Sequence, residues 1–247
     1  MNILRPVVCR NLLRNYSQFK IVLPSNHLLV NINRNFNVNQ RVLLPYSTTT
    51  MLTPTNDGII KNMFKKLKNS KSKLRGAGIL LYENIADGLN YFEFFKEFEM
   101  KDSFNSWFLV TELHVWLILT RVMQEGANPN EDGRFLRNCI VEAMWADIQM
   151  RSKKLGSDNP AFTRQQVSIL SEQFQASLLA YDEGLSFDDK TLASALWRRF
   201  FNSECDDFGK LEKLVKYVRK TSRELDLLTR DQITSINTKI SWLPLND

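Results

Sequence analysis

The amino-acid sequence predicts an all-α fold, a single irregular bundle of about seven to nine helices preceded by a disordered or amphipathic N-terminal segment. Three observations support this prediction. The 247 residues include only 9 Gly and 7 Pro, fewer than a turn-rich protein needs. From residue 79 onward, apolar residues recur every three or four positions, as on one face of a helix. No stretch shows the sustained alternation of apolar and polar residues that marks a half-buried strand.

The charge of the chain is unevenly distributed. Residues 1–56 contain six basic and no acidic residues, residues 57–78 contain seven basic and one acidic, and residues 79–247 contain 20 basic and 26 acidic. The overall charge of +6 therefore comes from the N-terminal third, whereas the rest of the chain is negative. A mildly acidic body is a poor composition for a nucleic-acid-binding domain.

The N-terminus has the composition of a mitochondrial transit peptide, which is free of acidic residues and rich in Arg, Asn, Ser and aliphatic residues. Arg5, Arg10 and Arg14 stand among aliphatic residues, and a helix would place the two kinds of side chain on opposite sides. A secretory signal needs a continuous apolar core, and this stretch has none. We predict a transit peptide over residues 1–50 and import into mitochondria. The alternative is a disordered basic tail.

The following segment, residues 51–78, is predicted to be a basic amphipathic segment that runs into a flexible linker ending at Gly76-Ala77-Gly78. A basic amphipathic helix suits an anionic membrane surface, and a basic tail suits RNA. A solvated linker is the alternative. The candidate membrane- or ribosome-binding residues are Lys61, Lys65, Lys66, Lys68, Lys71, Lys73 and Arg75.

Residues 79–247 are predicted to form the helical domain. A first helix over about 80–89 precedes an aromatic-rich stretch, and the most apolar segment of the domain, Phe104–Met123, follows. Its longest unbroken apolar run has only five residues, Val115–Leu119, and Glu112 and His114 lie near the middle of the segment. These features argue against a transmembrane span. We expect a central, buried helix.

Local signals mark the remaining helices of the domain. A turn at 128–133 precedes a helix that ends near residue 154. Thr163–Gln166 has the pattern of a capping box, and the helix it opens is predicted to end at Gly184 as a C-cap residue. Three more helices are predicted after this one. The first begins after a cap at Ser186–Asp189, and the second spans about 211–228. The third runs from a cap at Thr229–Gln232 to near Leu243.

Motifs for catalysis or metal binding are missing from the sequence. There is no Gly-rich phosphate loop and no nucleophile elbow. Cys139 and Cys205 have no CxxC partner. His114 is the one histidine beyond residue 78, so the paired Glu-x-x-His motifs of a di-iron bundle cannot form there. We predict no catalytic residue, no metal and no cofactor, with His114 as a core histidine bonded to a helix carbonyl or an acid. A Ser-His-Asp or Cys-His catalyst built on His114 is the alternative.

Aromatic and charged residues share several helix patterns. Trp107, Trp116, Trp145 and Trp197 have aliphatic neighbours, which predicts core packing; the alternative is that some expose a face to a hydrophobic client. Tyr181-Asp-Glu-Gly184 and Trp197-Arg-Arg199 combine aromatic and charged residues near helix ends. We predict a structural role for these two motifs, such as a buried ion-pair network, and the alternative is an interface.

Several of these strings occur together in one order. They are Trp107-Phe108, Leu113–Leu117 with Arg121, Glu142–Asp147 with Arg151, Ala180–Leu185, Leu192–Arg199 and Tyr217–Arg219. Their order and spacing resemble the ubiquinol–cytochrome c chaperone family over about residues 80–230. One residue departs from the family pattern, because Arg199 stands where Asn is expected. The motif and interface candidates implied by the resemblance are Trp107, His114, Trp116, Arg121, Trp145, Asp147, Arg151, Tyr181, Asp182, Glu183, Trp197 and Arg198.

The resemblance implies a non-enzymatic chaperone that assembles the ubiquinol–cytochrome c reductase complex (complex III). It implies binding of newly synthesised cytochrome b together with a small assembly-factor subunit, near the mitoribosome and in peripheral contact with the matrix side of the inner membrane, and it implies no DNA binding. Two other classes stay open. One is a mitochondrial lipid- or quinone-handling enzyme. The other is a mitoribosome-associated RNA-binding module, which only residues 61–75 favour and the acidic body opposes.

Overall fold

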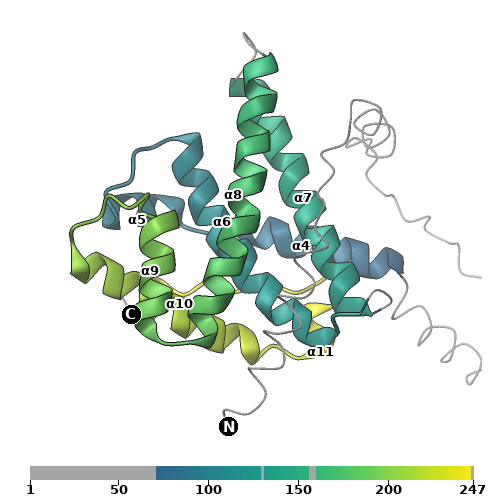
Figure 1. Ribbon diagram of the computed structural model, residues 1–247. Coiled ribbons are helices and arrows are strands. Elements are labelled where there is room, and N and C mark those ends of the chain that lie inside the picture. The colour runs from purple at the N-terminus through teal and green to yellow at the C-terminus, as the bar shows by residue number, and fades with distance from the viewer. Residues whose placement is uncertain (1–70, 129–130, 156–159, 246–247) are drawn as a thin grey trace, which may run out of the picture. The chain divides into compact units, whose positions relative to one another are not determined.

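The computed structural model describes residues 71–128, 131–155 and 160–245 (Figure 1). Every regular element in these ranges is helical, so the predicted all-α class is confirmed. In chain order they are α4 (Lys71–Ala86), α5 (Tyr91–Glu97), α6 (Phe104–Val122), the 3-10 turn η1 (Met123–Glu125), α7 (Asp132–Leu155), α8 (Pro160–Ser186), α9 (Asp189–Arg199), α10 (Phe208–Asp226) and α11 (Arg230–Ile233). The predicted transit peptide and Lys61, Lys65, Lys66 and Lys68 lie outside the described residues.

Helix α6 is the centre of the fold. It begins at Ser103, whose side chain accepts a hydrogen bond from the backbone N–H of Ser106. Helices α4, α5, α7, α8 and α10 all contact α6. Together with η1 it is long and apolar enough to cross a membrane, yet 89% of its apolar window is buried inside the described fold. It is therefore the core helix that the sequence predicts.

Helix α4 corrects the predicted linker. Residues 71–78 are helical, and Leu74, Ala77 and Gly78 are buried in the interface with α7. A Cβ atom on Gly78 would lie 2.6 Å from the Cβ of Cys139, which is closer than a non-bonded Cβ atom comes to its neighbours in real proteins. The glycine thus permits close packing of two helices and does not loosen the chain. The helical body therefore includes residues 71–78 and does not begin at residue 79.

Gly184 was wrongly predicted to end a helix. Helix α8 starts at Pro160, so Thr163 lies inside it, and it continues past Gly184 to Ser186. A Cβ atom on Gly184 would lie 2.6 Å from the Cα of Leu192, because α8 and α9 cross closely at this point. The cap predicted at Ser186–Asp189 is present as Asp188, which accepts the N–H of Thr191.

The C-terminal part of the prediction is half right. Thr229 and Gln232 form the predicted capping box at the start of α11. That helix ends at Ile233, not near Leu243, and residues 236–245, here called the C-terminal strap, contain no helix or strand. The strap runs back from α11 across the molecule toward α5, as the yellow trace in Figure 1 shows.

Candidate functional site

Asp147 joins α4 to α7 near the surface. Tyr82 of α4 donates its hydroxyl hydrogen to Asp147 Oδ2 at 2.7 Å. Arg151, one turn further along α7, donates Nε–H to both carboxylate oxygens at 2.9 and 3.0 Å. Burial, and then the hydrogen bond to Asp147, raise the pKa of Tyr82, so its phenol remains a donor. Asp147 therefore holds the guanidinium of Arg151 in one orientation.

The guanidinium of Arg151 lies over the ring of Trp107, 4.4 Å from its centroid. Trp107 in turn packs against Phe104 and Tyr91, with ring centroids 5.5 and 6.5 Å away. Trp107 is half-buried, and the side chain of Arg151 is 42% exposed. A partner can therefore reach this group, called the Trp107–Arg151 cluster (Tyr82, Trp107, Asp147, Arg151). Trp, Tyr and Arg are the residues most enriched at the energetic centres of protein interfaces.

Trp116, Tyr181 and Asp182 lie in the interior. The indole N–H of Trp116 donates to Asp182 Oδ1 at 2.7 Å, and the rings of Trp116 and Tyr181 lie 5.0 Å apart. All three side chains are buried, and burial raises the pKa of the Tyr181 phenol. Their contacts hold α6 against α8. This agrees with the predicted core packing of Trp116 and the predicted structural role of Tyr181. No partner reaches them in the folded state.

His114 is a buried core histidine, as predicted. One ring nitrogen, Nδ1, lies 2.7 Å from the carbonyl oxygen of Val110, and Nε2 lies 2.7 Å from the hydroxyl of Tyr217. Burial lowers the pKa of His114 to about 4, so the ring is neutral at physiological pH. Among the described residues, neither Cys139 nor Cys205 is bonded to it. Its contacts orient α6 against α10.

Arg121 has a structural contact as well. Its guanidinium donates to the carbonyl oxygen of Leu228 through Nε (3.1 Å) and Nη2 (2.5 Å), and to Glu125 through Nη1 (2.7 Å). The residue is buried. It therefore satisfies a carbonyl that follows the end of α10 and fixes that end against α6.

The other motif residues are not brought together. Trp145 is half-buried between Phe108 and Phe174. Trp197 donates its indole N–H to the carbonyl of Cys205 at 2.9 Å. Glu183 and Arg198 are exposed, and Arg198 donates to the hydroxyl of Ser194 on its own helix at 2.7 Å. In the Trp197–Arg199 motif, the residue that joins a buried ion pair is Arg199.

A buried ion pair does form from the Trp197–Arg199 motif, but its partner on α6 was not predicted. Arg199 donates Nε–H to Glu112 Oε1 at 2.7 Å and Nη2–H to Oε2 at 2.6 Å, while Nη1 donates to Gln173. Glu112 is fully buried on α6, and the Arg199 side chain is 16% exposed. The signal was present in the sequence, since a carboxylate amid an apolar helix needs a cation. Arg199 belongs to the Trp197–Arg199 motif, and what the sequence did not predict is its pairing with Glu112.

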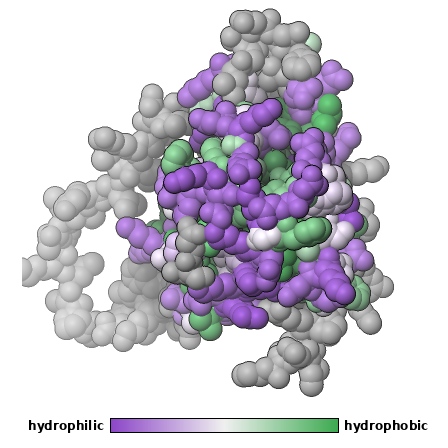
Figure 2. Space-filling model, turned by 90° about the vertical axis from the view of Figure 1, so that its left-hand side faces the viewer, coloured by the Kyte–Doolittle hydropathy of each residue, from purple (hydrophilic) through white to green (hydrophobic). Residues whose placement is uncertain are grey.

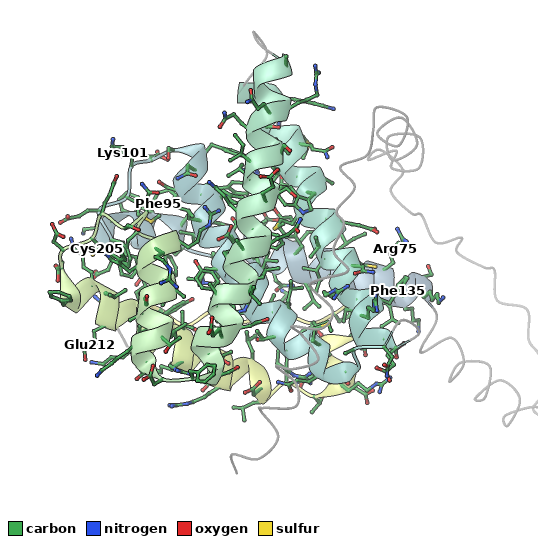
Figure 3. The ribbon with its side chains drawn as sticks, viewed as in Figure 1. Arg75, Phe95, Lys101, Phe135, Cys205 and Glu212 are labelled. Atoms are coloured by element: carbon green, nitrogen blue, oxygen red, sulfur yellow. The ribbon has the colours of Figure 1, made fainter. Side chains whose placement is uncertain are left out.

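The described basic candidates are part of the helical body. The side-chain charges of Lys71 and Arg75 lie 5.9 and 6.0 Å from the ring centroid of Phe135 on α7, and Arg75 pairs with Glu142 at 3.5 Å. Figure 3 shows Arg75 and Phe135 on the same side of the fold. Lys73 is exposed on the same helix. These residues are held by the fold, unlike the flexible basic linker that the sequence predicted.

No metal centre is evident in the part of the chain that the structure describes. Its residues include no group of three or more His, Cys, Asp or Glu side chains that could hold a metal. Figure 2 shows one face as largely hydrophilic, with separate green patches in place of a continuous apolar surface.

Comparison with known proteins identifies the family. Residues 96–241 match the model of the family described as "Ubiquinol-cytochrome C chaperone". This chain belongs to the ubiquinol–cytochrome c chaperone family. The matched range contains α6 through α11 and every member of the Trp107–Arg151 cluster except Tyr82.

Named relatives of this family are similar over most of the chain. The ubiquinol-cytochrome c reductase complex assembly factor 1 of Drosophila melanogaster is 56% identical over 76% of this chain and 74% of its own length. The human protein of the same name is 41% identical over 72% of this chain and 58% of its own length. The crystal structure of the Cbp3 homolog from Brucella abortus matches with a TM-score of 0.57 and 22% identity, covering 75% of this chain and 97% of that one. This last match supports the fold.

Proposed function

We infer that this protein is a mitochondrial assembly factor for the ubiquinol–cytochrome c reductase complex. The observation that carries the inference is the family match over residues 96–241, joined to relatives that are named as assembly factors of that complex. The transit-peptide composition of residues 1–50 supports import into mitochondria. Its action is binding and not catalysis, which fits a buried, neutral His114 and an accessible aromatic–cation cluster.

The finer proposal concerns the client. The protein binds newly synthesised cytochrome b together with a small assembly-factor subunit, at the matrix side of the inner membrane. Cells that lack it should lose cytochrome b and assembled complex III first, whereas complexes without cytochrome b should be less affected. Quantitative native gels of the respiratory complexes measure this. Normal complex III in such cells would remove the assembly-factor proposal.

The Trp107–Arg151 cluster is the proposed contact surface for a protein partner. Its aromatic ring and guanidinium are accessible and are held in place by Asp147 and Tyr82. Arg151→Ala should reduce the amount of partner that co-purifies with the protein from mitochondria, while the helical circular dichroism stays unchanged. Lys154→Ala is the matched control, because Lys154 is exposed on the same helix. If both variants recover the same amount of partner, the cluster stabilises the fold and does not bind the partner.

The basic residues from Lys61 to Arg75 are proposed to attach the protein to an anionic surface, that of the membrane or the mitoribosome. Neutralising Lys61, Lys65, Lys66 and Lys68 together should weaken attachment in a salt-sensitive way, because surface electrostatic binding is screened by ions. Sedimentation with membranes and with ribosomes at two salt concentrations separates the two targets. If attachment to both is unchanged, the basic residues have no such role.

A further inference from the structure

Arg151 is fixed by the fold through one of its three guanidinium nitrogens. Its Nε–H donates to both oxygens of Asp147 at 2.9 and 3.0 Å, and its guanidinium carbon lies 4.4 Å from the ring centroid of Trp107. Within residues 71–128, 131–155 and 160–245, Nη1 and Nη2 of Arg151 donate no hydrogen bond. The side chain is 42% exposed. The guanidinium is therefore held in one orientation while its terminal N–H groups are unused.

Other arginines of the family strings use all three nitrogens inside the fold. Arg121, Arg199 and Arg219 each donate through Nε, Nη1 and Nη2 to carbonyl, carboxamide or carboxylate oxygens. Their side chains are at most 16% exposed. Holding a long side chain in one rotamer costs conformational entropy, which the contacts of the other arginines offset more fully than those of Arg151. Arg151 is thus ordered as they are, but most of its donors remain open to a ligand.

The open edge of the Arg151 guanidinium determines which ligand fits. Nη1 and Nη2 form a planar fork whose N–H groups point in parallel, and such a fork binds both oxygens of a carboxylate at once. A neutral amide offers one acceptor oxygen and no charge, so it fits less well. An accessible carboxylate of another molecule is therefore the ligand that matches this edge.

Asp147 orients Arg151 without covering the open edge, because its contact is with Nε. The Asp147 side chain is 14% exposed, and its oxygens accept hydrogen bonds from Tyr82 as well as from Arg151. The negative charge of Asp147 is therefore shared between two donors within the fold. A carboxylate from outside would meet the guanidinium on the edge that carries only N–H groups.

Aromatic side chains form the surface beside Arg151. Trp107 packs against Phe104 and Tyr91, and the rings of Tyr91 and Phe95 lie 6.4 Å apart. These four side chains are half-buried, and Phe92, on the same helix as Phe95, is 73% exposed. Apolar neighbours that exclude water strengthen a hydrogen-bonded charge pair at an interface. The surface therefore suits a carboxylate that has an apolar residue beside it.

We propose that Arg151 binds an acidic side chain, Asp or Glu, of a protein partner. The partner's carboxylate accepts hydrogen bonds from Nη1 and Nη2, and an adjacent apolar side chain of the partner packs on Phe104 and Trp107. Asp147 is a positioning residue, because it touches Arg151 and not the partner. This inference rests on the proposed role of the Trp107–Arg151 cluster as a contact surface, and it names the chemistry that this surface recognises.

The test uses the full-length protein and a defined probe, the peptide N-acetyl-Leu-Glu-Leu-amide. Nuclear magnetic resonance follows the Nε–H signal of Arg151 and the indole N–H signal of Trp107 while the peptide is added. Both signals should shift in a saturable way, with a Kd in the millimolar range because the contact is small. The matched peptide N-acetyl-Leu-Gln-Leu-amide lacks only the charge and should bind at least about fivefold more weakly.

A pair of variants separates the planar fork from the charge alone. Arg151→Lys keeps the positive charge but has no bidentate fork, so it should bind the Glu peptide at least about fivefold more weakly, as followed at the Trp107 signal. Arg198→Lys is the matched control, because Arg198 is exposed on α9, and it should bind the Glu peptide as the wild-type protein does. Far-UV circular dichroism checks that both variants fold.

Three results would overturn the proposal. The first is equal binding of the Glu and Gln peptides by the wild-type protein, which decides the question even if Arg151→Lys does not fold. The second is a folded Arg151→Lys variant that binds the Glu peptide as tightly as the wild-type protein. The third is tighter binding of inorganic phosphate than of the Glu peptide, because the ligand would then be a phosphate group.

These titrations use purified protein, so their outcome is independent of the levels of complex III in cells. Normal complex III in cells that lack the protein would remove the assembly-factor proposal and leave the binding of the Glu peptide intact. Conversely, a protein that does not bind the Glu peptide but loses its partner in Arg151→Ala would keep the contact surface and reject the carboxylate as its ligand.

Discussion

Replacing Arg199 with Ala tests the buried ion pair at the centre of the fold. The side chain of Glu112 is fully buried, and Arg199 meets both of its oxygens at 2.6–2.7 Å. Removing one member of a buried, hydrogen-bonded pair leaves an uncompensated charge and costs about 3–5 kcal/mol. A domain of this kind has about 5–15 kcal/mol of stability in total. We therefore expect Arg199→Ala to lower the free energy of unfolding by about 3–5 kcal/mol.

The loss should depend on pH. Burial raises the pKa of Glu112, and the hydrogen bond and charge of Arg199 oppose this rise. Without Arg199 the folded-state pKa of Glu112 rises further above its value in the unfolded chain. Stability linked to such a group is present at low pH and is lost as pH rises through the folded-state pKa. The deficit of Arg199→Ala relative to wild type should therefore be smaller at pH 5 than at pH 8.

Urea denaturation followed by far-UV circular dichroism measures both effects. Arg198→Ala is the matched control, because Arg198 is the preceding residue on α9 and is exposed. The free energy of unfolding of Arg198→Ala should stay within about 0.5 kcal/mol of the wild-type value. Arg199→Asn introduces the residue expected from the family pattern. Its free energy of unfolding should fall by nearly as much as that of Arg199→Ala, since a neutral amide cannot replace the cation. Equal stability of Arg199→Ala and Arg198→Ala would refute the reasoning.

Three further predictions concern the core and the N-terminus. Trp116→Ala should lower the free energy of unfolding by about 3–5 kcal/mol in urea titrations, since the indole is fully buried; a loss of partners with unchanged stability would make Trp116 an interface residue. Burial lowers the pKa of His114 to about 4 from 6.5, so the free energy of unfolding should decrease as pH falls through this range. His114→Gln should reduce the difference in unfolding free energy between pH 7 and pH 5. An unchanged difference would show that other groups cause it. Residues 1–56 fused to a reporter should direct it to mitochondria and appear as a shortened product on immunoblots, whereas a cytosolic, full-length reporter would contradict a transit peptide.

The helical class was predictable because each helix carries its own periodic signal. The apolar segment around Trp116 and the capping box at Thr229 are local patterns, and local patterns survive in the fold. Glycine was misleading, because the same residue permits either a left-handed cap or a close helix contact. Gly78 and Gly184 both serve the second purpose, and only the neighbouring helix reveals it.

Contacts between residues that lie far apart in the sequence could not be predicted from it. The bond between Tyr82 and Asp147 joins residues 65 positions apart, and that between Asn84 and Ile240 joins residues 156 apart. No spacing rule links such pairs. The strap was predicted to be helical up to Leu243, but the carbonyl of Thr238 and the N–H groups of Ile240 and Leu245 are bonded to Asn84 and Glu93 instead.

Burial divides the family-motif residues into two groups with different consequences. Trp116, Arg121 and Asp182 are buried and bonded to other parts of the fold, so their substitution removes partner binding only by destabilising the protein. Trp107 and Arg151 are accessible, and their substitution should act on binding with the fold retained. The contact surface that we propose therefore lies beside α7, where Trp107 and Arg151 are accessible. Stability and partner recovery, measured on the same variants, separate these two groups.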